Sequence, residues 1–323
     1  MTELHAVDSV EIRILVDNAT DGLSTVPPHA QTEFAGLARR GGLALAGENL
    51  CHASHGFSCL VTATRGTAKR TVLFDAGPDE ESFRRNVARL DADMGAVDAV
   101  VLSHGHWDHA GGLLAALELI RKRNGGADVP LHAHDGMFVA RGLETPRVFL
   151  RFGEVPSPDS LERHGARRDA TETRHTLLDG TFELSGEIPR NTPFERGFPG
   201  HQRQAADGSW EPDPLLLDER ALWLRVAGKG LVVFTACSHA GVVNVLQHAR
   251  ALHPDVPIHA VIGGFHLAGG TESIIEPTVN AMRQLDLRVV APGHCTGWRA
   301  MGALAQALGP AVDPIAVGKR YIF

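Results

Sequence analysis

The sequence predicts an α/β protein in which strands lead into ligand-rich loops and helices follow. The clearest example spans residues 100–113, where an apolar β-branched run ends in the sequence H-G-H-W-D-H (residues 104–109) and a glycine pair opens an apolar helix. His239 and His294 repeat this order, since each follows an apolar run and precedes a helical pattern. Such alternation of strands and helices is typical of layered α/β folds.

In the first half of the chain, apolar runs predict strands and amphipathic periodicity predicts helices. The expected strands are residues 10–16, 57–64, 71–76, 99–103 and 129–134, with a turn at 65–67 between the second and third. The expected helices are residues 80–90 and 111–123, and a short helix is expected at 33–40. That short helix lies in a Gly- and Pro-rich loop over 19–49, and loops of this length are often functional.

The second half contains a segment of weak periodicity, residues 141–214, with short strands expected at Thr181–Leu184 and Glu187–Arg190. We interpret it as an irregular insertion within one domain of residues 1–323, and we expect it to cover the active site, next to residues 104–109. Beyond it, apolar runs at 221–227 and 231–236 flank Gly228-Lys229-Gly230 and predict a hairpin. The remaining expected elements are strands at 258–263 and 287–291 and helices at 241–252, 273–285 and 298–308.

The composition excludes several classes of protein. The 323 residues are 43% hydrophobic and 21% charged, as in ordinary globular proteins. The net charge of −7 argues against nucleic-acid binding, which needs clustered Lys and Arg. No apolar run reaches the roughly 18 residues of a membrane span. The N-terminus lacks an apolar signal core, and the four cysteines fit no disulfide framework. We therefore expect a cytoplasmic protein with a small-molecule partner and leave a homodimer open.

Residues 104–109 contain four side chains of the kind that bind metal ions. His104 and His106 alternate and so point the same way in extended backbone, and Asp108 and His109 follow at the turn. Imidazole and carboxylate together suit zinc, iron or manganese. Four such residues in six positions, directly after a buried strand, predict a metal site and not a polar loop that faces water.

Other candidate residues lie at strand ends. His239 and His294 are predicted ligands because they share the context of His104. His266 is a ligand, a group that orients one, or a substrate-binding residue. Cys237 is either a thiolate ligand or a buried structural thiol.

A second set of candidates would support the site from outside. Asp75, at a strand end, is placed to accept an N–H from a ligand histidine or from a turn, and His55 either reaches the site or caps a strand. Trp107 is expected to pack beside the metal ions. The candidate clamps for phosphate or carboxylate groups are Arg190, Arg299 and Lys319. The middle region also offers His134, His164, His175 and His201, and none of these histidines has a distinctive context.

The H-x-H-x-D-H pattern resembles the signature of the metallo-β-lactamase superfamily, in which His104, His106, Asp108 and His109 would be ligands. The resemblance implies a four-layer αβ/βα sandwich of two mixed sheets flanked by helices. It also implies one or two divalent metal ions, with zinc expected first and manganese or iron as alternatives. The superfamily usually has a bridging Asp at the end of the hairpin strand, where this sequence has Cys237-Ser238-His239, so the metal count stays open.

Several segments are similar to one group of that superfamily, named for 7,8-dihydropterin-6-ylmethyl-4-(β-D-ribofuranosyl)aminobenzene 5′-phosphate synthase. These segments are residues 16–18, 54–58, 73–77, 186–190, 194–195, 237–239, 263–267 and 294–297. They are spread from one end of the chain to the other, so the resemblance extends over most of the chain.

The resemblance implies a metal-dependent hydrolase, or a related lyase, that acts through a metal-bound hydroxide on a small anionic substrate. Phosphoesters, lactones and pterin phosphates are such substrates, and Asp108 and His106 would be the catalytic residues, with Asp108 as ligand and water-orienting base. One alternative is an iron-dependent oxidoreductase of the persulfide-dioxygenase type on the same fold. Another is a non-catalytic ligand-binding module, against which the intact residues 104–109 argue.

Overall fold

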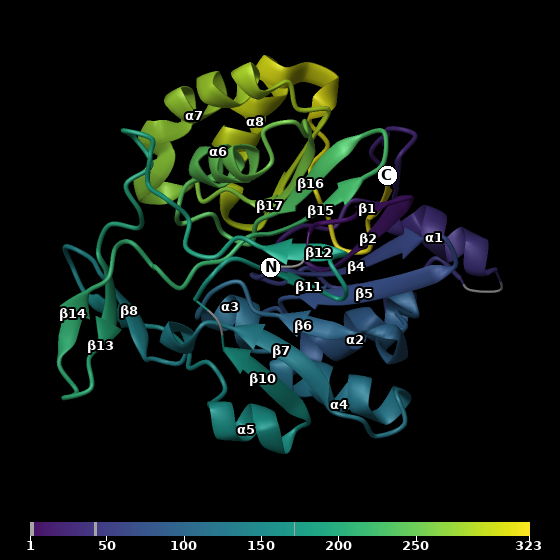
Figure 1. The fold of residues 1–323 in the computed structure, drawn as a ribbon, viewed down its shortest axis with the longest axis horizontal. Helices are drawn as coiled ribbons and strands as arrows, with labels where there is room; N and C mark the ends of the chain where they lie inside the picture. Colours follow the sequence, from purple (N-terminus) through teal and green to yellow (C-terminus); the bar gives the residue numbers. More distant parts are fainter. Residues whose placement is uncertain (1–2, 42–43, 171) are drawn as a thin grey trace.

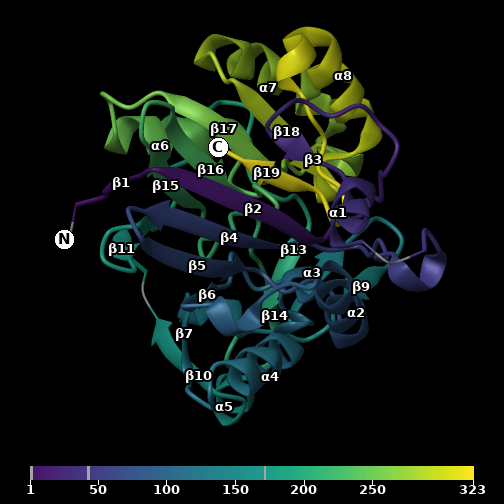
Figure 2. The same cartoon turned by 90° about the vertical axis from the view of Figure 1, so that its right-hand side faces the viewer.

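Two large β-sheets face each other, and helices cover their outer sides (Figures 1 and 2). The computed structural model describes residues 3–41, 44–170 and 172–323. Helices α2 (Glu80–Leu90), α4 (Leu113–Arg123) and α5 (Pro158–Arg163) lie on one outer side. Helices α6 (Val242–Leu252), α7 (Ile275–Met282) and α8 (Trp298–Leu308) lie on the other. The order helix, sheet, sheet, helix confirms the predicted αβ/βα sandwich.

The first sheet contains most of the N-terminal strands in the order β10-β7-β6-β5-β4-β2-β19-β3. Their bounds are β2 Ser9–Val16, β3 Ala30–Gln31, β4 Ser58–Arg65, β5 Ala68–Phe74, β6 Ala99–Val101, β7 Val129–Ala133, β10 Ala166–Ala170 and β19 Arg320–Ile322. Strands β5, β6, β7 and β10 run parallel, so their C-terminal ends share one edge. The short strands β3 and β19 were not predicted, and α1 (Glu33–Arg40) confirms the predicted short helix.

The second sheet has the order β11-β12-β15-β16-β17-β18, with β1 (Ala6–Val7) beside β15. Its bounds are β11 His175–Leu177, β12 Phe182–Leu184, β15 Leu222–Val226, β16 Gly230–Phe234, β17 Ile258–Gly264 and β18 Val289–Gly293. The β15–β16 hairpin is confirmed, and β16, β17 and β18 run parallel. His239 and His294 therefore follow parallel strands of this sheet.

The core consists of one buried cluster between the sheets and one behind each sheet. The alternation of strand side chains determines which cluster a residue joins. In β6, Val101 faces the other sheet and Val100 faces the helices. We keep the single domain of residues 1–323 as a prediction, since both sheets contribute to the central cluster. Among the described residues, no helix is long and apolar enough to cross a membrane.

Residues 141–214 form more regular structure than the sequence indicated. Strands β8 (Arg141–Glu144), β9 (Phe149–Arg151), β13 (His201–Gln204) and β14 (Trp210–Pro212) make a small antiparallel sheet that projects from the sandwich (Figure 1). Strand β10 belongs to the first main sheet, and β11 and β12 belong to the second. Strand β12 confirms the strand predicted at 181–184.

The strand predicted at Glu187–Arg190 is wrong. Gly186 turns the chain with a φ of 66°, and Pro189 has no N–H to donate to a ladder. The apolar residue of this segment, Ile188, instead packs into the cluster beneath α6. Its apolar character therefore reflects burial without strand pairing.

A first prediction concerns Gly111, at the C-terminal end of helix α3 (Trp107–Ala110). A Cβ at Gly111 would lie 1.8 Å from the Pro78 carbonyl oxygen, although its backbone is helical with φ −61° and ψ −29°. We expect Gly111→Ala to lower the free energy of unfolding by roughly 1–3 kcal/mol, because the clash is with backbone. Urea denaturation measures this loss.

The matched control is Gly302→Ala in α8, where a Cβ would have no neighbour within 4 Å. There the same substitution should stabilise the protein by about 0.5–1 kcal/mol, since glycine is costly inside a helix. Equal effects of the two substitutions would contradict the steric argument.

Candidate metal centre

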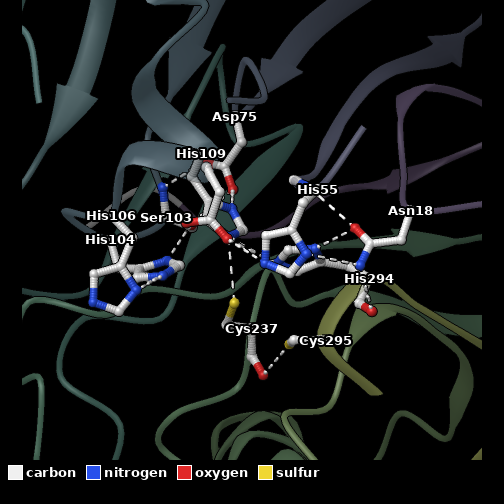
Figure 3. Close-up of polar contacts among 12 residues, drawn as sticks. Asn18, His55, Asp75, Ser103, His104, His106, His109, Cys237, His294 and Cys295 are labelled. Carbon is white, nitrogen blue, oxygen red and sulfur yellow. Dashed lines mark hydrogen bonds and ion pairs between the residues drawn. The ribbon is translucent and has the colours of Figure 1, made fainter. Parts of the chain in front are cut away.

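The H-G-H-W-D-H motif (residues 104–109) begins shortly after the end of β6 and continues into helix α3 (Figure 3). His106 is in extended backbone at the N-terminus of α3, and that helix carries Asp108 and His109. The side chains of His104 and His109 are completely buried. Figure 3 shows His104 and His106 on one side of His109, and His55 and His294 on the other.

Asp75 holds this motif in place from the end of β5. One carboxylate oxygen accepts the backbone N–H of Ser103 at 2.8 Å. The other accepts the Ser103 hydroxyl and lies 2.7 Å from Nδ1 of His109. Because a carboxylate only accepts, Nδ1 of His109 carries the proton and its Nε2 faces inward. Asp75 thus contacts a ligand candidate as predicted, and it does so from a backbone φ of 57°.

Three other rings are oriented in the same way by an acceptor on their outer side. The Ser103 hydroxyl proton is used by Asp75, so Nδ1 of His104 donates to the Ser103 oxygen at 2.8 Å. Nδ1 of His201 lies 2.8 Å from the Asp213 carbonyl oxygen. Nδ1 of His294 lies 3.0 Å from Oδ1 of Asn18, whose amide nitrogen is directed at other acceptors.

The inward nitrogens of these rings face one another at short distances. Nε2 of His109 lies 3.2 Å from Nε2 of His294. His106 lies between two other rings, 3.1 Å from Nε2 of His104 and 3.0 Å from Nε2 of His201. A neutral His106 has only one ring proton, so it can donate to only one of these two neighbours. At the other contact, two nitrogen lone pairs face each other without a proton between them. Among the described residues, neither ring nitrogen of buried His239 has a hydrogen-bond partner.

This donor set fits divalent cations. Bare imidazole nitrogens that converge in a buried space repel one another unless a cation lies between them, and outer acceptors that fix the tautomer are typical of metal-binding histidines. Cysteine, histidine and carboxylate groups within 4.8 Å of one another form four adjacent sets: His104, His106 and His239; His104, His109 and Cys237; Cys237, His266 and Cys295; and His55, Asp108 and His294. The sets offer two neighbouring positions, with His109 and Cys237 between them.

The charges of the site also suit a cation. Burial lowers the pKa of His104, His106 and His239 well below the ordinary value, so these rings are neutral. Burial opposes the ionisation of Asp108, but His109 and His294 outweigh it and hold the pKa of Asp108 below its usual range. For His109, burial is overcome by Asp108 and Asp75, which raise its pKa to about 9, so in the metal-free protein its Nε2 also carries a proton, which a bound cation would displace.

A pocket of about 470 Å³ opens onto these donors. Its lining includes the predicted residues His55, Trp107, Cys237 and His266, together with Phe152 and Phe198 from the 141–214 segment. His55 places Nε2 3.5 Å from the Asp108 carboxylate, and Cys237 places Sγ 3.2 Å from Nε2 of His109. The ring of His266 lies 4.3 Å from that of His239, centroid to centroid.

The three candidate anion clamps do not line this pocket. Lys319 donates to the Asp313 carboxylate, and Arg299 pairs with Glu272 at 3.2 Å. Arg190 donates to the carbonyl oxygens of Ile188 and Leu215. These cations are used by local carboxylates and carbonyls, which their sequence context did not show.

Several important residues were not distinguished by the sequence. His201 was one of four equal candidates, and only the β8–β13 pairing brings it to His106. Asp218 accepts the backbone N–H of Gly105 at 3.1 Å, and Glu219 accepts that of His239 at 2.7 Å. The available signal was two adjacent acids before an apolar strand, which is common on protein surfaces.

The two sheets and the donor set together define a metallo-β-lactamase fold protein. A model of the β-lactamase superfamily domain matches residues 70–191. A solved metal-dependent hydrolase of the β-lactamase superfamily is similar with a TM-score of 0.70 at 24% identity, covering 96% of this chain and 98% of that one. The metallo-β-lactamase fold protein YhfI of Bacillus subtilis has a TM-score of 0.51 at 12% identity, covering 98% and 100%.

Among curated proteins, the chain is similar to a 7,8-dihydropterin-6-methyl-4-(β-D-ribofuranosyl)-aminobenzene-5′-phosphate synthase of Methanocaldococcus jannaschii. The two are 28% identical over 269 residues, which are 82% of this chain and 88% of that protein. An uncharacterized protein of the same organism is 29% identical over 254 residues, covering 79% and 88%. These matches confirm the resemblance to the superfamily and to the synthase group.

The buried rings predict how stability of the metal-free protein depends on pH. His104, His106 and His239 are neutral in the folded state, whereas the unfolded chain protonates them below about pH 6.5. The unfolded state then binds more protons, so each histidine lowers the free energy of unfolding by up to roughly 1.4 kcal/mol per pH unit as the pH falls. His109, with its raised pKa, acts oppositely and loses its contribution between about pH 6.5 and 9.

Urea unfolding of metal-free protein between about pH 7.5 and 5.5 measures this slope. The variant His239→Gln should reduce the slope, and substitution of exposed His52 by Asn should leave it unchanged. A stability that is flat over this range in the unsubstituted chain is inconsistent with buried neutral rings.

Cys237 is expected to contribute to metal binding, because its Sγ lies 3.2 Å from the inward Nε2 of His109. We expect Cys237→Ser to weaken metal binding by roughly tenfold or more in competition titrations with a chelator. The control is Cys51→Ser, which changes another buried thiol outside the site. Unchanged affinity in Cys237→Ser would show that this thiol only packs.

Proposed function

We propose that this protein is a metal-dependent hydrolase of a small substrate. The observation that carries the proposal is the convergence of buried ring nitrogens, which face one another or have no hydrogen-bond partner among the described residues. These nitrogens belong to His104, His106, His109, His201, His239 and His294. A binding module has no need for such an unfavourable arrangement. The cost is explained where the donors hold divalent ions at the floor of an open pocket.

We assign the metal-binding residues to two neighbouring positions. Zinc, or manganese or iron in its place, would be held by His104, His106 and His239 in one position and by Asp108, His109 and His294 in the next, with His201 and Cys237 adjacent. When bound, such ions lower the pKa of a coordinated water to about 7 and polarise a carbonyl or phosphoryl oxygen. Asp108 would accept a hydrogen bond from a water molecule at these donors and so orient it.

His55 has a defined role at the rim of the pocket. Asn18 donates its amide N–H to Nδ1 of His55 at 3.0 Å, so the ring proton lies on Nε2. Burial and then the neighbouring His294 lower the pKa of His55, which keeps the ring neutral. Its Nε2–H is directed toward Asp108 and can donate to a substrate oxygen that replaces this contact.

The walls of the pocket favour a substrate with an apolar or planar body. Trp107, Phe152 and Phe198 supply aromatic surface, and His55 stacks near Trp107 with ring centroids 6.0 Å apart. No Lys or Arg is among the described residues that line the pocket. An anionic or ester group would therefore be recognised at the metal donors, and the remainder of the substrate by the aromatic walls. Phosphoesters, lactones and pterin phosphates meet this requirement.

The test is a panel of phosphoesters, lactones, thioesters and a dihydropterin phosphate, assayed after loading with defined zinc, manganese or iron. We expect hydrolysis of at least one class, and we expect His106→Ala to lose nearly all turnover. Its metal affinity should fall by more than about 100-fold, beyond the effect typical of groups that only support ligands.

The matched control is His52→Ala, which removes an exposed imidazole outside the pocket. A folded His106→Ala protein with unchanged metal content and rate would refute the assignment. Native iron content with oxygen uptake, in place of hydrolysis, would favour the oxidoreductase alternative.

A further inference from the structure

A second cluster of metal-binding side chains lies where the two main sheets meet at one edge. His132 is on β7, Asp169 is on β10 and His175 begins β11. Strands β7 and β10 belong to the first sheet, and β11 is the edge strand of the second. One possible ligand atom from each of these residues lies within 4.8 Å of the other two. The cluster shares no residue with the metal centre described above.

Strand register explains why two of the three side chains meet. His132 and Asp169 are direct partners in the parallel β7–β10 pair, so their side chains leave the sheet on the same face. His132 is also the partner of Val101, whose side chain faces the second sheet. The imidazole and the carboxylate therefore point toward β11, where His175 lies.

The donors of this cluster are unsatisfied in a way that indicates a missing ligand. His132 is 93% buried, since its exposed fraction is 7%, and its Nδ1 has no hydrogen-bond partner among the described residues. A carboxylate oxygen of Asp169 lies 3.3 Å from that nitrogen without making a hydrogen bond. An unpaired polar atom in a buried position is costly, and a cation between imidazole and carboxylate would remove this cost.

His175 is oriented as a metal-binding histidine would be. Its Nδ1 lies 3.0 Å from the Thr173 carbonyl oxygen, to which it donates, so the proton of a neutral ring is on that side. Its buried Nε2 is then bare, and it has no hydrogen-bond partner among the residues that the structure describes. The ring centroids of His132 and His175 are 5.6 Å apart. A backbone acceptor that fixes the tautomer is typical of histidines that bind metal.

The geometry points to a site for a first-row divalent cation, held by His132, Asp169 and His175, that links the two sheets at their edge. Two imidazoles and one carboxylate suit zinc and its neighbours and not calcium or magnesium, which prefer oxygen ligands. Three protein donors leave a fourth position to water. Because His132 and Asp169 lie on one sheet and His175 lies on the other, the ion would connect strand β10 to strand β11.

Zinc titration of the full chain tests this proposal. Metal-free protein is equilibrated with zinc and dialysed against micromolar free zinc, and bound zinc per chain is measured by mass spectrometry. We expect His175→Ala and Asp169→Asn each to bind one zinc ion fewer than the unsubstituted chain. Both positions tolerate change, since His175 is only half-buried and Asp169 is exposed.

The matched control is His164→Ala, which removes a half-buried histidine from the end of α5 and should leave the zinc content unchanged. Introducing His175→Ala into His106→Ala should remove a further zinc ion, which separates this site from the metal centre. Equal zinc contents in the unsubstituted chain, His175→Ala and Asp169→Asn would overturn the proposal. An equal loss in His164→Ala would also overturn it, because the zinc would then be bound without specificity.

Discussion

The carboxylate of Asp75 is the contact on which the metal centre depends. It ends β5, accepts two hydrogen bonds from Ser103 after β6, and faces Nδ1 of His109 on α3. One completely buried side chain thus determines the distance between two strands and the position of a helix. It also determines protonation, because the Ser103 hydroxyl bound to Asp75 leaves its oxygen to accept from His104. The positions of the donors and their tautomers therefore have a common origin.

The fold could be predicted from the sequence because its main signals are local. The apolar runs that become β6, β16 and β18 are continuous, and α2 and α8 have clear amphipathic periodicity, so their bounds were nearly correct. The prediction for residues 141–214 was poor because the signals there are not local. Its strands are short and pair with distant partners, such as β13 with β8 and β10 with β7, and no local pattern specifies such pairing.

In the candidate site, too, local sequence signals could be interpreted and distant pairings could not. Residues 104–109 are adjacent in sequence, so their chemistry is visible without a structure. His201 becomes important only because β13 folds back toward His106, and Glu219 only because it accepts the N–H groups of His239 and Ala240. The sequence could not show that the candidate anion clamps lie outside the pocket, because the partners of an arginine or lysine depend on tertiary contacts. A residue type can indicate chemistry, but only tertiary packing gives it a partner.

The charge distribution explains how an acidic protein could bind an anionic substrate. The chain has a net charge of −7, and no described Lys or Arg lines the pocket, so the side chains there offer little fixed positive charge. The donors on its floor are mostly neutral imidazoles, and Asp108, Cys237 and Cys295 are the nearby groups that can carry negative charge. Two divalent ions would therefore leave a net positive floor beneath aromatic walls. Metal loading, and not the charge of the protein surface, would then decide whether an anion can enter.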